Sequence, residues 1–171
     1  GELAAQVLGF VGWRDNQFGG RYGLELHLDD KLRGEEGTLF NKADNSGRWI
    51  TLGEKVVDYA RDGDSFVLTI DRIAQYQTEK ILASAIEKFG AERGTIIVME
   101  VNTGKILALA NYPTYDPNNY AEADNMEVYR NLAVSDAYES GSVFKTITLA
   151  SALDAGKIAP ETTYVDTGTV V

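Results

Sequence analysis

Two nearly continuous apolar runs, separated by a three-residue turn, constrain the fold of this chain most. They cover residues 94–101 and 105–110, and Asn102-Thr103-Gly104 joins them. Glycine readily adopts the positive φ that a tight turn needs, so this arrangement predicts a hairpin. Strands that are apolar throughout, rather than alternating, are typical of a sheet that is covered on both faces. The sequence therefore predicts two buried central strands.

The flanking segments predict further elements of a mixed domain. Residues 65–70 have the composition of a strand, and Asp71 is a good N-cap for a helix that ends at Gly90. A second helix is expected over residues 142–155, ended by Gly156 and Pro160. This second helix is apolar nearly all round, which is typical of a buried helix.

The first third of the chain differs in the length and spacing of its apolar segments. Short apolar pieces at residues 7–12, 22–28 and 49–52 are separated by glycine-rich and polar breakers. Residues 24–32 fit either a strand or a short helix, because the alternation there is brief. We interpret residues 1–62 as a β-rich accessory region and residues 63–171 as part of a second domain. The predicted fold class is α+β.

Composition narrows the function classes. The chain has 171 residues, of which 44% are hydrophobic and 25% charged, as in a soluble globular protein. Its net charge of −10 argues against nucleic acid as a partner. It has no cysteine, which excludes disulfides, thiol catalysis and Cys-ligated zinc. There is no apolar run of transmembrane length, and since the chain starts without Met, we expect that an upstream anchor could have been removed.

The single histidine, His27, limits the available chemistry. A Ser-His-Asp triad could use only this residue, and a His-rich metal site is impossible. In a strand, its alternation with leucines would place it on the wetter face, so a structural role is favoured. Acidic residues are numerous, but no calcium-loop motif occurs. We predict neither a metal nor a cofactor.

Ser142 and Lys145 form the strongest candidate site. One helical turn brings residues three apart onto the same face, so the serine hydroxyl and the lysine amine can meet. A neutral lysine, favoured by burial, could take the proton of the serine and make it a nucleophile. The helix start would add backbone N–H groups for an oxyanion. The alternative is a plain helix start, with Ser142 as cap and Lys145 solvated.

Several motifs occur together in one order. They are Leu68-Thr69-Ile70-Asp71, residues 103–108, residues 112–118 and residues 139–145. In this order they resemble class B penicillin-binding proteins, the D,D-transpeptidases that crosslink peptidoglycan. Residues 7–12, 23–26 and 32–37 resemble the pedestal region of the same family, so the resemblance runs through almost the whole chain.

The resemblance implies a role for each site residue. Ser142 would be the acylated nucleophile, Lys145 its proton acceptor, and the Ser142 N–H half of the oxyanion hole. The substrates would be stem peptides ending in D-Ala-D-Ala, and β-lactams would acylate the same serine. The family further implies a membrane-anchored protein on the extracytoplasmic face of the cell membrane. It would act with other cell-wall synthesis proteins in cell shape or cell division.

The chain departs from the family pattern in two respects. Ser140 stands where family members usually have proline, which would leave the approach to the helix looser. The downstream Ser-x-Asn and Lys-Thr-Gly motifs of the family do not occur. We therefore expect a chain truncated after the Ser142 helix and inactive by itself. An apolar face left uncovered would favour self-association.

Two other classes of function remain open. The chain could be a non-catalytic module that contacts other envelope proteins through its glycine-rich first half. It could also be a penicillin sensor or a serine β-lactamase relative, which share Ser-x-x-Lys. The long pedestal pattern argues against a β-lactamase, which has no need of it.

Overall fold

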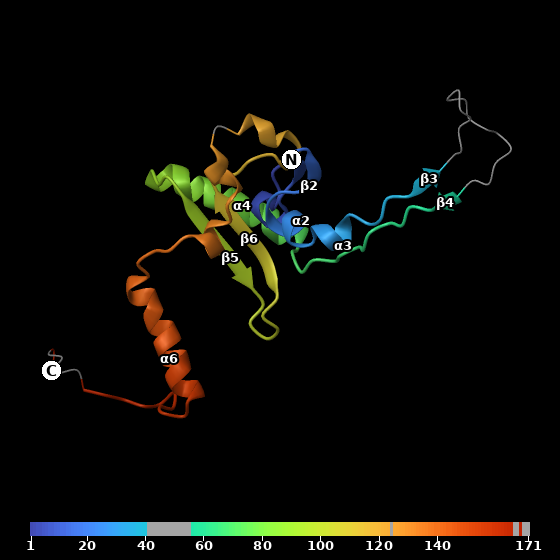
Figure 1. The fold of residues 1–171 in the computed structure, drawn as a ribbon. Helices are drawn as coiled ribbons and strands as arrows, with labels where there is room; N and C mark the ends of the chain where they lie inside the picture. The colour runs from blue at the N-terminus through green and yellow to red at the C-terminus, as the bar shows by residue number, and fades with distance from the viewer. Residues whose placement is uncertain (41–55, 124, 166–167, 169–171) are drawn as a thin grey trace, which may run out of the picture. The chain divides into compact units, whose positions relative to one another are not determined.

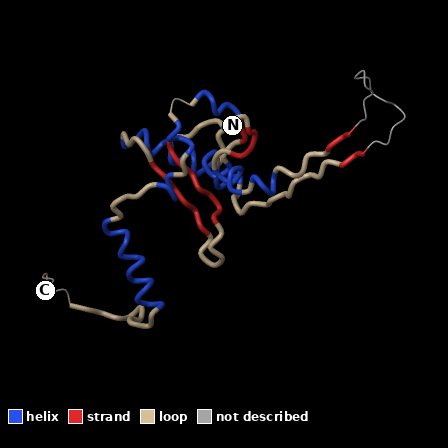
Figure 2. The backbone as a smooth tube through the Cα atoms, viewed as in Figure 1, coloured by secondary structure: helices blue, strands red, loops and turns tan. Residues whose placement is uncertain are grey.

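The predicted hairpin and the helix before it are present in a computed structural model, which describes residues 1–40, 56–123, 125–165 and 168 (Figures 1 and 2). The described chain divides into two compact units, Gly1–Asp136 and Ala137–Val171. β5 (Gly94–Met99) and β6 (Ile106–Tyr112) pair antiparallel, with Ile96 opposite Ala110. Gly104 in the connecting turn has a φ of 73°, as predicted. Helices and strands mix in the first unit, which confirms the α+β class.

Helix α4 (Arg72–Phe89) begins and ends where the sequence predicts. The Asp71 carboxylate accepts hydrogen bonds from the N–H groups of Ile73 and Ala74, at 3.0 and 2.8 Å. These bonds satisfy two of the N–H groups that every helix start leaves free. At the other end, Gly90 adopts the left-handed conformation that closes a helix.

Gln75 ties α4 to β6. Its side-chain amide donates to the carbonyl of Leu109 at 2.8 Å and accepts from the N–H of the same residue at 2.7 Å. The side chain thus pairs with Leu109 as a neighbouring strand would. Gln75 is fully buried, and its amide also donates to Glu79, which in turn accepts from the N–H of Ala4. This chain of bonds joins the N-terminus, the helix and the sheet.

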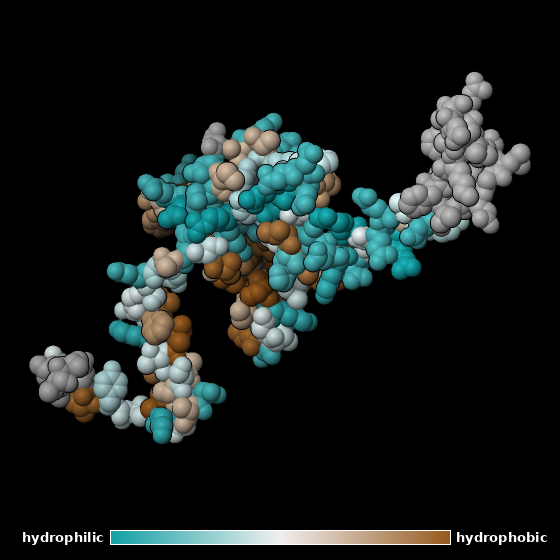
Figure 3. Space-filling view, in the orientation of Figure 1, coloured by the Kyte–Doolittle hydropathy of each residue, from teal (hydrophilic) through white to brown (hydrophobic). Residues whose placement is uncertain are grey.

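Within the first unit, the apolar hairpin is covered on one face. Leu82 and Ile86 of α4 pack with Ala110, and Ile96 adds to this cluster. In contrast, Ile97 and Met99 are 47% and 54% exposed. The space-filling view shows hydrophobic surface over the hairpin (Figure 3). Within the first unit, α4 covers one face of the hairpin, and cover of the other face remains a prediction.

Residues 65–70 do not form the predicted strand. The segment has no regular secondary structure, although it lies beside β6. The Thr69 hydroxyl donates to the carbonyl of Ile106 at 2.7 Å, and the N–H of Asp71 donates to the carbonyl of Leu107 at 2.8 Å. Further along the same edge, the Gln75 side chain bonds to Leu109, where a longer strand would pair.

The N-terminal region consists of short elements. They are α1 (Ala5–Leu8), β1 (Val11–Arg14), β2 (Gln17–Gly20), α2 (Gly23–His27), α3 (Asp29–Leu32), β3 (Thr38–Phe40) and β4 (Val56–Asp58). The strands pair as two hairpins, β1 with β2 and β3 with β4. Of the two alternatives for residues 24–32, the structure has the helix, and His27 is exposed at the end of α2. The apolar piece at residues 49–52 lies outside the described residues.

An aromatic core joins this region to the loop after β6. Phe10 stacks on Tyr120 with ring centroids 4.2 Å apart, and it meets Tyr115 and Tyr129 edge-on. Tyr22 stacks on the same phenylalanine at 5.6 Å. The loop carries the 3-10 helices η1 (Pro117–Glu122) and η2 (Met126–Tyr129), followed by α5 (Leu132–Ser135). The domain boundary predicted between residues 62 and 63 remains a prediction.

Two glycines allow α1 and α2 to approach. Gly9 has a φ of 80°, and a Cβ on it would lie 1.7 Å from the carbonyl oxygen of Tyr22. Gly23 has a φ of 56°, and its Cβ would lie 2.5 Å from the carbonyl oxygen of Val7. Only glycine fits such contacts, so these two positions fix how the N-terminal segments meet.

Candidate active site

Ser142 and Lys145 lie at the start of the main helix of the second unit. A 3-10 turn, η3 (Gly141–Val143), leads into α6 (Phe144–Asp154). Gly141 begins the turn with a φ of 55°, a conformation that glycine adopts at no steric cost. The predicted helix over residues 142–155 is confirmed. The structure therefore places serine and lysine on successive turns of one helix start, at the spacing the sequence predicts.

Within the second unit, the surroundings of this pair are open. Ser142 and Lys145 are both exposed, and no hydrogen bond joins their side chains in the part of the chain that the structure describes. The helix itself was predicted to be buried, yet Phe144, Ile147 and Leu149 are each about half exposed. Figure 3 shows this hydrophobic surface along α6. Within the second unit taken by itself, no described residue covers the apolar sides of the helix, and the burial of the helix remains a prediction.

Ser140 already has the backbone of a proline. Its φ of −70° lies within the range that a proline ring imposes, about −65 ± 15°. Its N–H donates no hydrogen bond to any described residue. The path into the helix therefore does not depend on a proline at this position. What serine lacks there is the stiffness that a ring would add.

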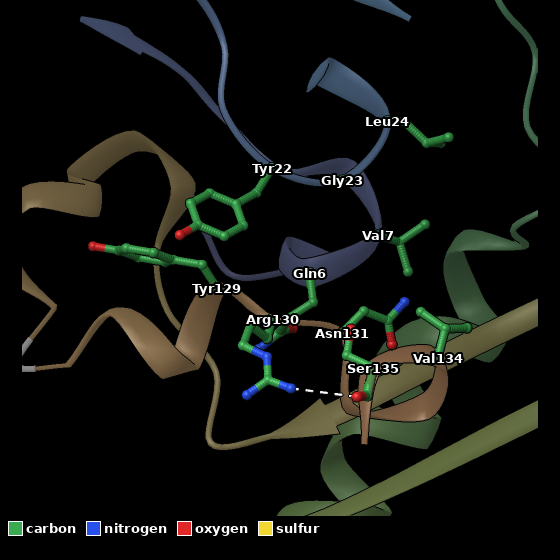
Figure 4. Close-up of a pocket in the computed structure, with 10 residues that line it drawn as sticks. All are labelled: Gln6, Val7, Tyr22, Gly23, Leu24, Tyr129, Arg130, Asn131, Val134 and Ser135. Carbon is green, nitrogen blue, oxygen red and sulfur yellow. Dashed lines mark hydrogen bonds between the residues drawn. The ribbon is translucent and has the colours of Figure 1, made fainter. Parts of the chain in front are cut away.

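A separate pocket of about 440 Å³ lies in the first unit (Figure 4). Residues of α1 and α2 line one side, and residues 129–135 line the other. Neither Ser142 nor Lys145 contributes to it. Arg130 is the charged residue of its lining, and this guanidinium is already bound to Glu127, to Asp136 and to the carbonyl of Ser135. The guanidinium in the lining of this pocket is thus already paired with two carboxylates and a carbonyl.

The described residues contain neither a cluster of metal-binding side chains nor a helix of membrane-spanning character. No group of three or more His, Asp or Glu side chains in residues 1–40, 56–123, 125–165 and 168 lies close enough to hold a metal ion. Over the same ranges, no helix is both long and apolar enough to cross a membrane.

Sequence comparisons with known proteins all point to the same family. Residues 94–170 match the penicillin binding protein transpeptidase domain. The chain is 40% identical over 158 residues to a probable peptidoglycan D,D-transpeptidase, PenA, of Neisseria meningitidis, covering 92% of this chain and 26% of that protein. It is 37% identical over 160 residues to stage V sporulation protein D of Bacillus subtilis, with 92% and 24% covered.

A solved structure agrees with these sequences. The crystal structure of penicillin binding protein 2X from Streptococcus thermophilus superposes with a TM-score of 0.72 at 26% identity, covering 96% of this chain and 25% of that one. The fold is thus that of the penicillin-binding transpeptidases. In sequence and fold the chain corresponds to a segment of the class B penicillin-binding proteins. It spans about a quarter of the length of the curated relatives named here.

Proposed function

We propose that the protein containing this chain is a peptidoglycan D,D-transpeptidase of cell-wall synthesis, with Ser142 as nucleophile and Lys145 as base. The observation that carries the proposal is the coincidence of two facts. Relatives named as D,D-transpeptidases match 92% of the chain, and Ser142 and Lys145 occupy the first turns of a helix inside the matched transpeptidase domain.

The proposed chemistry has two acyl transfers. The Ser142 hydroxyl attacks the carbonyl carbon of the penultimate D-alanine while the Lys145 amine takes its proton. The backbone N–H of Ser142, at the helix start, stabilises the negative oxygen that forms. When the C–N bond breaks, the proton passes to the leaving D-alanine, and an ester on Ser142 remains. The amine of a second stem peptide then attacks this ester, forms the crosslink and restores the serine hydroxyl.

β-Lactams would follow the first half of this path. Attack by Ser142 opens the ring amide, but the leaving nitrogen stays tethered to the acyl group and blocks the second amine. We propose stem peptides ending in D-Ala-D-Ala and β-lactams as ligands, cell-wall synthesis proteins as partners, and a membrane-anchored location on the extracytoplasmic face. A role in cell shape or cell division belongs to the same proposal, as does self-association through uncovered apolar surface.

The mass of the intact protein, before and after a β-lactam, tests the nucleophile. We expect one adduct per protein, located by peptide mapping on Ser142, in a protein that includes the whole transpeptidase domain. Ser142→Ala should abolish the adduct, whereas Ser140→Ala, which removes a neighbouring hydroxyl, should keep it. An adduct that maps elsewhere refutes the assignment. The chain of 171 residues alone should give none, because its sequence lacks Ser-x-Asn and Lys-Thr-Gly.

The base requires a separate test. Lys145→Ala should slow acylation by about a hundred-fold, within the usual range for a lost general base. Lys157→Ala, an exposed lysine just beyond α6, should leave the rate unchanged. An adduct that persists for hours favours a transpeptidase, whereas rapid release would favour the β-lactamase alternative. Equal rates in both lysine variants would refute Lys145 as base.

A further inference from the structure

The turn that carries Ser142 is tighter than an α-helix. The 3-10 helix η3 contains Ser142, and α6 follows it directly. Val143 has a ψ of −29° and Phe144 a ψ of −20°. These values are those of a 3-10 helix, since ψ in an α-helix is about −42°. The tight geometry therefore extends over the two residues that separate Ser142 from Lys145.

This geometry decides how Ser142 and Lys145 are aligned along the helix. A 3-10 helix has about 3.0 residues per turn, so residues three apart lie directly above one another. An α-helix has about 3.6 residues per turn, so the same two residues are rotated by about 60° around the axis. A base must come within hydrogen-bond reach of the proton that it takes. The tight turn thus favours proton transfer from Ser142 to Lys145.

Thr146 is bonded across this turn. Its hydroxyl donates to the carbonyl of Val143 at 2.7 Å, which is the most common length of an O–H···O hydrogen bond. The bond runs from a residue to the one three positions before it, which is the spacing that a 3-10 turn brings together. Threonine hydroxyls in helices can bond to such carbonyls and alter the local course of the helix. The hydroxyl of Thr146 therefore supports the tight geometry directly.

Other side chains do not hold the start of this helix in the described part of the second unit. Neither Ser140, before η3, nor Val143, before α6, caps its helix through a side-chain hydrogen bond. Among the described residues of the unit, only Thr146 gives a side-chain hydrogen bond to the backbone of residues 140–143. Thr148 makes a similar contact to the carbonyl of Phe144, but at 3.3 Å, beyond the usual range for a hydroxyl donor.

We propose that Thr146 is a positioning residue for acyl transfer: its hydroxyl keeps the Ser142 turn in 3-10 geometry and so holds Ser142 in line with Lys145. This inference rests on the proposed function. Thr146 itself neither takes nor gives a proton in the reaction, because its hydroxyl hydrogen is engaged by Val143. Without that hydroxyl, the turn relaxes toward α-helical geometry and Lys145 rotates away from the serine. All the contacts that support the inference lie within the second unit.

The test measures two quantities in the protein with its whole transpeptidase domain: the affinity for a fluorescent β-lactam before acylation, and the first-order rate of Ser142 acylation. Thr146→Val removes only the hydroxyl and should lower this rate about ten-fold, since a displacement of about 1 Å can cost a hundred-fold. The affinity should change less than about two-fold, because the turn geometry acts on the proton transfer. Thr146→Ser keeps the hydroxyl and should retain most of the rate.

Thr148→Val is the matched control. It makes the same substitution on the same helix at another exposed threonine, and it should acylate as the unchanged protein does. A merely structural role for Thr146 would lower the melting temperature and the fraction of active protein, but not the rate per active site. Equal rates per active site in Thr146→Val and Thr148→Val overturn the inference.

A double variant shows whether Thr146 acts through Lys145. If it does, Thr146→Val should slow the Lys145→Ala protein less than about two-fold, because the base that the turn aligns is already absent. A further ten-fold loss in the double variant would mean that Thr146 acts independently of the lysine, and would overturn the inference.

Amide hydrogen exchange examines the turn without any acylation. Residues 142–147 should exchange at least about five-fold faster in Thr146→Val than in Thr148→Val, because the bond across the turn is lost. If the unchanged protein takes up no β-lactam on Ser142, the proposed function fails, and exchange alone decides whether Thr146 holds the turn. Equal exchange in the two variants refutes that role.

Discussion

Gln75 offers the sharpest test of how the first unit is held together. In Gln75→Leu, the N–H and the carbonyl of Leu109 both lose their partner at a fully buried position. Each unpaired buried group costs about 1–3 kcal/mol. The added apolar surface of leucine offsets part of this loss, so we expect a fall of about 2–4 kcal/mol in the free energy of unfolding.

Urea unfolding of the chain, followed by far-UV circular dichroism, measures the change. The midpoint should fall while the slope stays constant, because the exposed area on unfolding is nearly the same. Gln77→Leu is the matched control, since Gln77 is exposed on the same helix and the substitution is identical. Its effect should stay within about 0.5 kcal/mol.

The comparison of these two variants decides the reasoning. If Gln75→Leu destabilises no more than Gln77→Leu, the Leu109 groups find other partners, and Gln75 does not act as a strand neighbour. A larger fall with a changed slope would mean that the unfolded or native ensemble has changed as well.

Three further predictions concern backbone contacts and titration. Gly9→Ala should prevent folding, since a Cβ would overlap the carbonyl of Tyr22. Gly104→Ala meets open space, so it should lower the free energy of unfolding, measured by thermal unfolding, by only about 1 kcal/mol. Burial, with a smaller effect of nearby tyrosines, raises the pKa of Tyr115 to about 12. The contribution of Tyr115 to the free energy of unfolding is therefore full below pH 10 and is lost as the pH rises from 10 through 12. Tyr115→Phe should flatten this alkaline loss of stability, and an unchanged loss would refute the assignment. The hydrogen bond from the backbone N–H of Gly20, followed by the neighbouring Arg33, lowers the pKa of the Asp29 carboxyl below 3.8. Its contribution to the free energy of unfolding is therefore present above pH 3.8 and is lost as the pH falls through the lowered pKa. Asp29→Asn should reduce the acid sensitivity of unfolding, and equal acid midpoints would contradict this.

The sequence predicted the elements whose signals are local. Helix α4 has its cap at Asp71, its stop at Gly90 and apolar residues at helical spacing between them, so its bounds follow from neighbouring residues alone. The hairpin turn at Gly104 is equally local. The placement of Ser142 and Lys145 on one helix start depends only on their spacing, and for that reason it was predicted as well.

Features that depend on distant partners were not predicted. Residues 65–70 have the composition of a strand. Beyond them, however, the N–H and the carbonyl of Leu109 in β6 bond to the side chain of Gln75 and not to a further strand residue. The ion pair between Arg93 and Asp136 spans 43 positions, and nothing in either local sequence marks the other as its partner. The exposure of α6 depends on what covers it, which composition cannot report.

The aromatic core also sets an order of events during synthesis. The Tyr115 hydroxyl donates to the carbonyl of Ala5, a contact that spans 110 positions, and Phe10 stacks on Tyr120 across a similar distance. A ribosome that has made α1, β1 and β2 has not yet made the rings that bury Phe10. The first segments must therefore wait, with apolar side chains accessible, until Tyr129 leaves the exit tunnel. Folding of this unit is thus governed by closure of one long loop, and the interval before that closure is when the nascent chain is most open to aggregation or to chaperones.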